Sequence, residues 1–292
     1  MDSSNHIGPS PLPLPLERAE VAFDGFRTSP VLDHPECLAF DPVDATVWCG
    51  GEAGQIFHID LAAGTIELVD HNPGGFTLGL GFGPDRRLYW LDALRRQVRR
   101  LAVGGDGGVE VVIDGRVGDR DLVYPNALAF APDGTMYFSD SHDGPAEVGG
   151  IYRITHDGVP SLWHEGPFRF ANGVALAPDG SALYVAESDG RAVARVEIRP
   201  NGSAGPITRP WSLGQRVPDG LAFGPDGRLY VGCYYPSQIL RLGPGGEGVL
   251  VGEDPFGGVL SNPANLVFHG AAAYVANLGR WHITRIDMSE IL

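Results

Sequence analysis

Four oxygen-bearing side chains, far apart in the sequence, each stand directly before a short apolar run. They are Glu36, Asn126, Asn172 and Asp219. Two carboxylates and two amides form an oxygen-only donor set whose charge can balance a dication, which favours Ca²⁺, Mg²⁺ or Mn²⁺ over softer metals. Each residue alone could equally serve a turn or cap a loop, as Asn and Asp often do beside Gly. Their shared sequence context favours a metal site.

That context is a sequence motif that recurs six times, and we call each copy a phrase. A phrase consists of a small turn, an apolar triplet, a Pro-Asp-Gly-like turn and an aromatic-rich strand. The second residue of the phrase falls at positions 36, 78, 126, 172, 219 and 264, so successive copies are 42, 48, 46, 47 and 45 residues apart. Six copies at this period predict an all-β, six-bladed β-propeller. The innermost strand of each propeller blade lines the central channel, so residues at one phrase position should meet there.

Each copy has room for four short antiparallel strands. In the first copy we expect them at residues 37–40, 46–50, 55–60 and 65–69. The last copy has room for three, and we expect residues 20–26 to supply its outer strand and close the ring. Residues 18–292 then form one domain, preceded by an extended or disordered lead-in at 1–17. An α/β fold is rejected because the connections are too short for crossover helices.

The composition excludes several classes of protein. The formal net charge is −15, and no extended basic face is available for nucleic acid. No stretch approaches the roughly 20 apolar residues of a membrane span, and no secretory signal is evident. The three cysteines show no CxxC spacing, so neither a disulfide framework nor a zinc knuckle is indicated. We expect a cytoplasmic protein that is a monomer or a weak homo-oligomer.

Four of the phrases resemble the senescence-marker-protein, gluconolactonase and luciferin-regenerating-enzyme family, over essentially residues 20–287. They are Pro35-Glu36, Tyr124-Pro125-Asn126, Phe170-Ala171-Asn172-Gly173 and Pro218-Asp219-Gly220. The resemblance implies that Glu36, Asn172 and Asp219 bind a metal and that Asn126 lies beside it as a ligand or substrate contact. It also implies metal-dependent lactone hydrolysis with Asp219 as general base. We expect one divalent ion, with Ca²⁺ favoured and Mg²⁺, Mn²⁺ or Zn²⁺ as alternatives.

Two positions depart from the family pattern. Sugar-acid lactonases of the family often carry Arg where this chain has Tyr124, and Asp where it has Ala127. An Arg would hold a polyhydroxylated or anionic substrate, because its guanidinium makes paired, charge-assisted hydrogen bonds. Tyr124 leaves a more apolar rim. The substrate is expected to be a small lactone or ester, and the two departures argue against gluconolactone itself.

Loops on the face that bears the metal should supply the wall of a substrate pocket. The candidates, besides Tyr124, are His34, Trp90, His142, Glu187, Tyr235 and Asn277. His142 could be a proton shuttle or an ordinary loop residue.

In the expected mechanism the metal polarises the carbonyl and lowers the pKa of a bound water, and Asp219 accepts that water's proton. Serine-nucleophile chemistry lacks support because no G-x-S-x-G elbow is present. Two alternatives stay open: another metal-assisted carbonyl reaction, such as isomerisation or condensation, and a non-enzymatic binding propeller stabilised by its metal.

Overall fold

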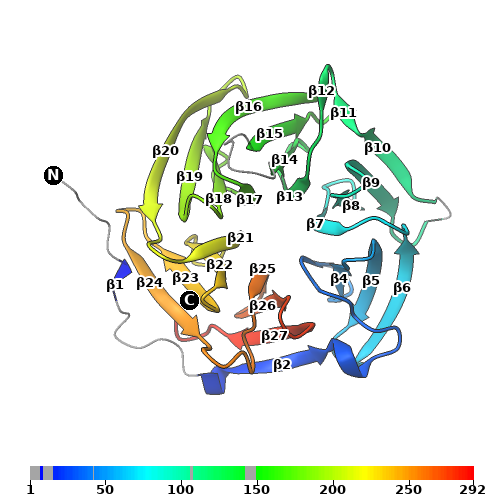
Figure 1. Cartoon of the computed structure of the whole chain (residues 1–292), viewed down its shortest axis with the longest axis vertical. Coiled ribbons are helices and arrows are strands. Elements are labelled where there is room, and N and C mark those ends of the chain that lie inside the picture. Colours follow the sequence, from blue (N-terminus) through cyan, green and yellow to red (C-terminus); the bar gives the residue numbers. More distant parts are fainter. Residues whose placement is uncertain (1–6, 9–15, 42, 106–107, 142–148) are drawn as a thin grey trace.

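Six antiparallel sheets surround a central opening in the computed structural model (Figure 1). The structure describes residues 7–8, 16–41, 43–105, 108–141 and 149–292. Each of these six sheets is one blade, and one of its edge strands lies nearest the axis. Each inner strand contacts the inner strands of both neighbouring blades, so the ring is continuous. The predicted all-β, six-bladed β-propeller is confirmed.

In the first five blades the four strands follow one another in sequence from the axis outward, whereas the outermost strand of the sixth blade comes from the N-terminal segment. The first blade contains β3 (Leu38–Phe40), β4 (Val47–Gly50), β5 (Gln55–Asp60) and β6 (Thr65–His71), and the second contains β7 (Thr77–Phe82), β8 (Arg87–Asp92), β9 (Gln97–Ala102) and β10 (Glu110–Asp114). The third contains β13 (Pro125–Phe130), β14 (Met136–Asp140), β15 (Gly149–Ile154) and β16 (Pro160–Phe168). The fourth contains β17 (Ala171–Leu176), β18 (Ala182–Glu187), β19 (Ala192–Ile198) and β20 (Ala204–Ser212).

The fifth blade contains β21 (Val217–Phe223), β22 (Leu229–Tyr235), β23 (Gln238–Leu242) and β24 (Gly248–Glu253), and the sixth contains β25 (Pro263–His269), β26 (Ala272–Asn277), β27 (His282–Asp287) and β2 (Ala19–Asp24). A small hairpin, β11 (Arg116–Val117) and β12 (Arg120–Asp121), joins the second and third blades. The strands of the first copy lie within two residues of their predicted bounds. None of the helices among the described residues is long and apolar enough to cross a membrane.

The Pro-Asp-Gly turns join the first two strands of several blades. In the third blade the Asp133 carboxylate accepts a hydrogen bond from the Thr135 backbone N–H at 2.9 Å. Gly134 follows it with φ 91°, a backbone conformation that glycine adopts without steric cost. These turns stand at the far end of the inner strand from Asn126. They therefore close the blade on the face opposite the four candidate ligands.

A separate apolar cluster fills each of the six interfaces between neighbouring blades. Between the third and fourth blades, for example, Phe168 and Ile151 pack with Val185 and Leu183. Between the first and second blades the cluster includes Ile56, Leu88 and Trp90. These clusters hold the blades in a fixed ring, and so hold the starts of the inner strands at fixed positions around the axis.

The N-terminal segment closes the ring as predicted. The strand β2 pairs antiparallel with β27, and Phe23 packs in the cluster between the sixth and first blades. The strand ends at Asp24, because the Asp24 carboxylate accepts a hydrogen bond from the Phe26 backbone N–H and begins a 3₁₀ helix, Gly25–Arg27. Within the expected lead-in, β1 (Ile7–Gly8) pairs parallel with β24 at the outer edge of the fifth blade, and a 3₁₀ helix begins at Leu16.

Candidate metal centre

A β-bulge begins the inner strand of blades two to six. In the third blade the inner strand advances three residues from Pro125 to Leu128, while β14 advances two from Asp140 to Phe138. The other four blades show the same single extra residue. A bulge re-aims a side chain that would otherwise alternate between the two faces of the sheet. Asn126, Asn172 and Asp219 all lie within these bulges.

Two glycines that follow ligand candidates allow neighbouring inner strands to approach closely. A Cβ on Gly173 would lie 2.2 Å from the carbonyl oxygen of Asp219, and one on Gly220 would lie 2.4 Å from the carbonyl oxygen of Ala264. Such distances leave room only for glycine. The glycines of the Asn-Gly and Asp-Gly pairs therefore allow backbone contacts between blades, and the pairs do not form turns. This excludes the interpretation of Asn172 and Asp219 as turn residues.

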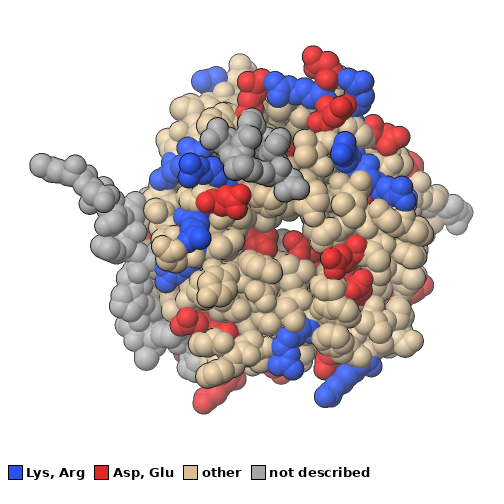
Figure 2. Space-filling view, viewed as in Figure 1, with Lys and Arg blue, Asp and Glu red and all other residues tan. Residues whose placement is uncertain are grey.

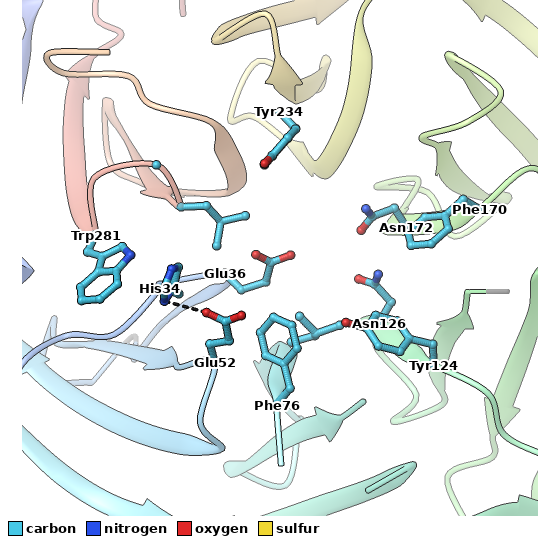
Figure 3. A pocket seen from close by; sticks show the side chains of 13 residues that line it. His34, Glu36, Glu52, Phe76, Tyr124, Asn126, Phe170, Asn172, Tyr234 and Trp281 are labelled. Atoms are coloured by element: carbon cyan, nitrogen blue, oxygen red, sulfur yellow. Dashed lines mark ion pairs between the residues drawn. The ribbon is translucent and has the colours of Figure 1, made fainter. Parts of the chain in front are cut away.

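The structure brings the four predicted ligands to the axis. Glu36, Asn126 and Asn172 line one cavity of about 470 Å³, and Figure 3 shows their side chains pointing toward a common centre. Asp219 does not line the cavity and is 7% exposed, but its carboxyl interacts with Glu36 and hydrogen-bonds with the Asn172 side chain. Acidic atoms are visible at the central opening in Figure 2. Whether the four residues bind a metal stays a prediction.

Two serines that the sequence analysis missed hold the two Asn amides. The Asn126 Nδ2 donates to Ser141 Oγ at 3.1 Å, and Ser141 Oγ donates to the Ala171 carbonyl at 2.6 Å. The Asn172 Nδ2 likewise donates to Ser188 Oγ at 3.1 Å, and Ser188 Oγ donates to the Pro218 carbonyl at 2.7 Å. Each serine orients an amide and ties its blade to the next one. A signal was available, since each Ser directly follows the second strand of its blade.

Removing the Ser188 hydroxyl should loosen Asn172. We expect Ser188→Ala to weaken divalent-metal affinity about 10-fold or more, the usual cost of removing a group that orients a ligand. Ser181→Ala, which removes an exposed hydroxyl from a turn of the same blade, is the matched control. Calorimetric titration of both variants measures the effect, and equal affinities would show that Ser188 does not position a ligand.

The electrostatics of the centre favour a cation. Burial, and then the nearby Glu52 carboxylate, raises the pKa of Glu36 to about 7. Burial, and then the Glu36 carboxylate, raises the pKa of Asp219 well above its ordinary value. Among the described residues, the buried Glu36 Oε2 atom has no hydrogen-bond partner. An unpartnered buried oxygen and two carboxyls held close together fit a hard divalent ion, because its charge would offset their repulsion.

An aromatic collar surrounds this polar centre. We give this name to four residues, each two positions before a phrase position at the axis: His34, Phe76, Tyr124 and Phe170. All four line the cavity, together with Tyr234 from the end of β22 and with Leu278, Gly279, Trp281 and Glu52 from loops. The predicted wall residues His34 and Tyr124 therefore line the cavity. Phe76 and Phe170 were missed, although the repeat that located the metal ligands contains them two residues earlier.

His34 is held at the edge of the cavity. Its Nδ1 lies 2.7 Å from both Asp33 Oδ1 and Glu52 Oε2, and its ring lies against Trp281 with 4.3 Å between centroids. Asp33, His34 and Glu52 form a compact group of possible metal-ligating atoms. The carboxylates of Asp33 and Glu52 therefore extend the negative charge from the centre to the rim of the cavity.

The predictions for Glu187 and Asn277 as wall residues are wrong. Both side chains are fully buried at the end of the second strand of their blades. Glu187 accepts a hydrogen bond from the Arg169 backbone N–H at 2.9 Å and pairs with Arg209, while Asn277 accepts one from the Ser261 backbone N–H at 2.8 Å. They stabilise the loops that lead into the inner strands.

The predictions for Trp90 and Tyr235 are wrong as well. Trp90 is fully buried in the apolar cluster between the first two blades, because its side chain faces the neighbouring sheet. Tyr235 is 66% exposed and does not line the cavity, whereas the preceding residue, Tyr234, does. Successive side chains of a strand point to opposite faces, so these two neighbours in β22 point in opposite directions. His142 lies outside the described residues.

The fold and the site define a β-propeller that gathers oxygen ligands at one end of its channel. Residues 105–276 match the sequence model of the SMP-30/Gluconolactonase/LRE-like region. The chain belongs to this family, which confirms the resemblance.

Individual relatives agree with this placement. A gluconolactonase from Zymomonas mobilis is 30% identical over 190 residues, a match that covers 58% of this chain and 52% of the relative, so the chain spans about half of that protein. A solved gluconolactonase from Xanthomonas campestris superposes with a TM-score of 0.75 at 20% identity, covering 92% of this chain and 89% of that one. Regucalcin from Agrobacterium tumefaciens, described as a calcium-binding protein, superposes with a TM-score of 0.70 at 15% identity, covering 87% of this chain and 92% of that one.

Proposed function

We propose that the protein is a metal-dependent lactonase whose ion is bound by Glu36, Asn126, Asn172 and Asp219. The observation that carries the proposal is the meeting of the Glu36 carboxyl and two amides in one cavity, with the Asp219 carboxyl interacting with Glu36 and Asn172. Ca²⁺ is the favoured ion, because all the donors are oxygens and a structural neighbour is described as calcium-binding. The names of the relatives, gluconolactonase among them, support lactone hydrolysis as the reaction.

When bound, the ion would act as a Lewis acid on the lactone carbonyl and lower the pKa of water. The protein's own groups do the remaining work. Asp219 accepts a proton from the attacking water, whose oxygen bonds to the carbonyl carbon, and the ring C–O bond then breaks as the proton passes to the departing oxygen. Ser141 and Ser188 keep the Asn amides oriented.

The direct test is turnover of γ-butyrolactone before and after chelation. We expect chelator to abolish hydrolysis and added Ca²⁺, Mg²⁺, Mn²⁺ or Zn²⁺ to restore it. Metal-stabilised folding with no turnover would favour a binding propeller. Metal binding with turnover only of a different carbonyl substrate would favour isomerisation or condensation.

Replacing Glu36 by Gln should weaken metal binding by about 10-fold or more, because it removes one of two neutralising charges. Protons compete with the metal for the Glu36 carboxyl, whose pKa is about 7. Affinity in the wild-type protein should therefore rise as the pH is raised through about 7, and this part of the rise should vanish in Glu36→Gln.

Asp179→Asn is the matched control for Glu36→Gln. Asp179 is exposed, and its carboxylate accepts a hydrogen bond from the Ser181 backbone N–H in a Pro-Asp-Gly turn. Calorimetric titration at several pH values compares the two variants. Identical metal affinities for both would contradict the assignment of Glu36.

A further inference from the structure

Five of the thirteen residues that line the cavity carry a phenyl, phenol or indole ring. Phe76, Tyr124 and Phe170 stand on one side, Tyr234 and Trp281 on others, and the polar centre lies between them (Figure 3). Neither Lys nor Arg occurs among the thirteen lining residues. A volume of about 470 Å³ falls in the usual range for small-molecule pockets, roughly 300–1,000 Å³. The walls thus offer stacking surfaces and no cation for an anionic group.

Backbone hydrogen bonds to buried carboxylates hold two residues of the collar in place, so the collar is not a chance grouping of exposed rings. The Phe76 backbone N–H donates to the buried Asp92 carboxylate at 3.0 Å, and the Tyr124 N–H donates to the buried Asp140 carboxylate at 2.6 Å. Phe170 has φ 57°, a left-handed backbone that bulky residues rarely adopt. A backbone held in this way limits the conformational freedom that these residues lose when a ligand stacks on them.

Several polar groups of the cavity are engaged with other protein groups, although Glu36 Oε2 has no hydrogen-bond partner among the described residues. Both Asn amides donate to serines, and His34 Nδ1 contacts two carboxylates. A polyhydroxylated ligand needs many matched hydrogen bonds, and burying its hydroxyls without them is costly. Glu52 and Asp33 at the rim would also repel an anionic ligand, and would favour departure of the carboxylate that ring opening produces.

We propose that the natural substrate class is an uncharged lactone bearing an aromatic substituent, which the collar holds by stacking while the lactone carbonyl faces the polar centre. This inference rests on the proposed lactonase function. The reaction stays a hydrolysis: one water adds across the ring C–O bond and yields a hydroxy acid that retains the aromatic group.

The test compares three probes: γ-phenyl-γ-butyrolactone, γ-butyrolactone and glucono-δ-lactone. For each, kcat/KM is divided by the rate constant for hydroxide-catalysed hydrolysis of the same lactone. We expect the phenyl lactone to exceed γ-butyrolactone by about 10-fold or more, the effect of stacking together with buried apolar area. Glucono-δ-lactone should be the poorest of the three.

Two variants connect the preference to the collar. Phe76→Leu and Phe170→Leu keep an apolar side chain but remove the ring, and each should lower the ratio of phenyl lactone to γ-butyrolactone by about 3-fold or more. Phe256→Leu is the control, because Phe256 is 93% exposed and lies outside the cavity. Thermal melting shows whether each variant is folded. The wild-type ratio tests the inference even if a variant fails to fold.

Calorimetric binding of the phenyl lactone separates the possible failures. Hydrolysis with no preference for the phenyl lactone would overturn the substrate class and leave the lactonase proposal standing. Binding of the phenyl lactone that weakens in the collar variants, without hydrolysis of any probe, would overturn the lactonase proposal and support the ligand class. Neither binding nor hydrolysis would overturn both.

Discussion

Replacing Asp219 by Asn is expected to lower kcat by roughly 100-fold or more, because the amide keeps one oxygen for a metal but cannot accept a proton. Metal binding should weaken far less than it does in Asp219→Ala. Asp219 is buried and interacts with both Glu36 and Asn172, and Asn can occupy its place with little change in volume. The measurement is kcat of the Asn variant across a metal titration.

This titration separates the role of ligand from that of base. If Asp219 were only a ligand, saturating metal would return the Asn variant to nearly the wild-type rate. Full recovery would therefore transfer the base role to another group. Glu52 would be the first to test, because it lines the cavity and its side chain is 50% exposed. His142 would be the second.

Deleting residues 1–24 is expected to cause the largest loss of stability. The deletion removes β2, leaves the edge of β27 unpaired and takes Phe23 from the cluster between the sixth and first blades. The melting temperature should fall by at least about 10 °C, since the loss approaches the whole stability of a typical domain, about 5–15 kcal/mol.

Deleting residues 1–17 is the control for this truncation. It removes β1, which adds only Ile7–Gly8 to the outer edge of β24, and it leaves β2 whole. Its melting temperature should stay within a few degrees of wild type. Equal melting of the two truncated proteins would show that pairing of β2 with β27 does not hold the ring closed.

The convergence of the four candidate ligands could be predicted, because the repeat spacing places equivalent residues at equivalent points around the axis. In a propeller, one position of the repeat recurs around the axis, so Glu36, Asn126, Asn172 and Asp219 could be grouped without knowledge of any contact. Ring closure was predictable for a related reason, as the last copy lacks a strand that only the N-terminal segment can supply. The bulges and the serine contacts were not predicted, because both depend on the register between strands.

The cavity wall was predicted less well, because much of it comes from loops. Trp281 lies in the turn between β26 and β27 with φ 49°, and its orientation toward the cavity depends on that backbone. Glu187 and Asn277 were wrongly predicted because each is the last residue of the second strand in its blade. Asp92 and Asp140 occupy the same position in their blades. In the structure these buried side chains all accept backbone hydrogen bonds, so the pattern marks loop support.

The central claim is that one divalent ion at the axis is required for lactone hydrolysis. It is tested most directly by adding Ca²⁺ to metal-stripped protein while heat of binding and rate of γ-butyrolactone hydrolysis are followed in parallel, and by repeating the titration with the other three divalent ions. The account predicts one equivalent bound per chain, with activity rising along the same curve for at least one ion. Full activity in the stripped protein, or stoichiometric binding of all four ions with no gain in rate, would contradict it.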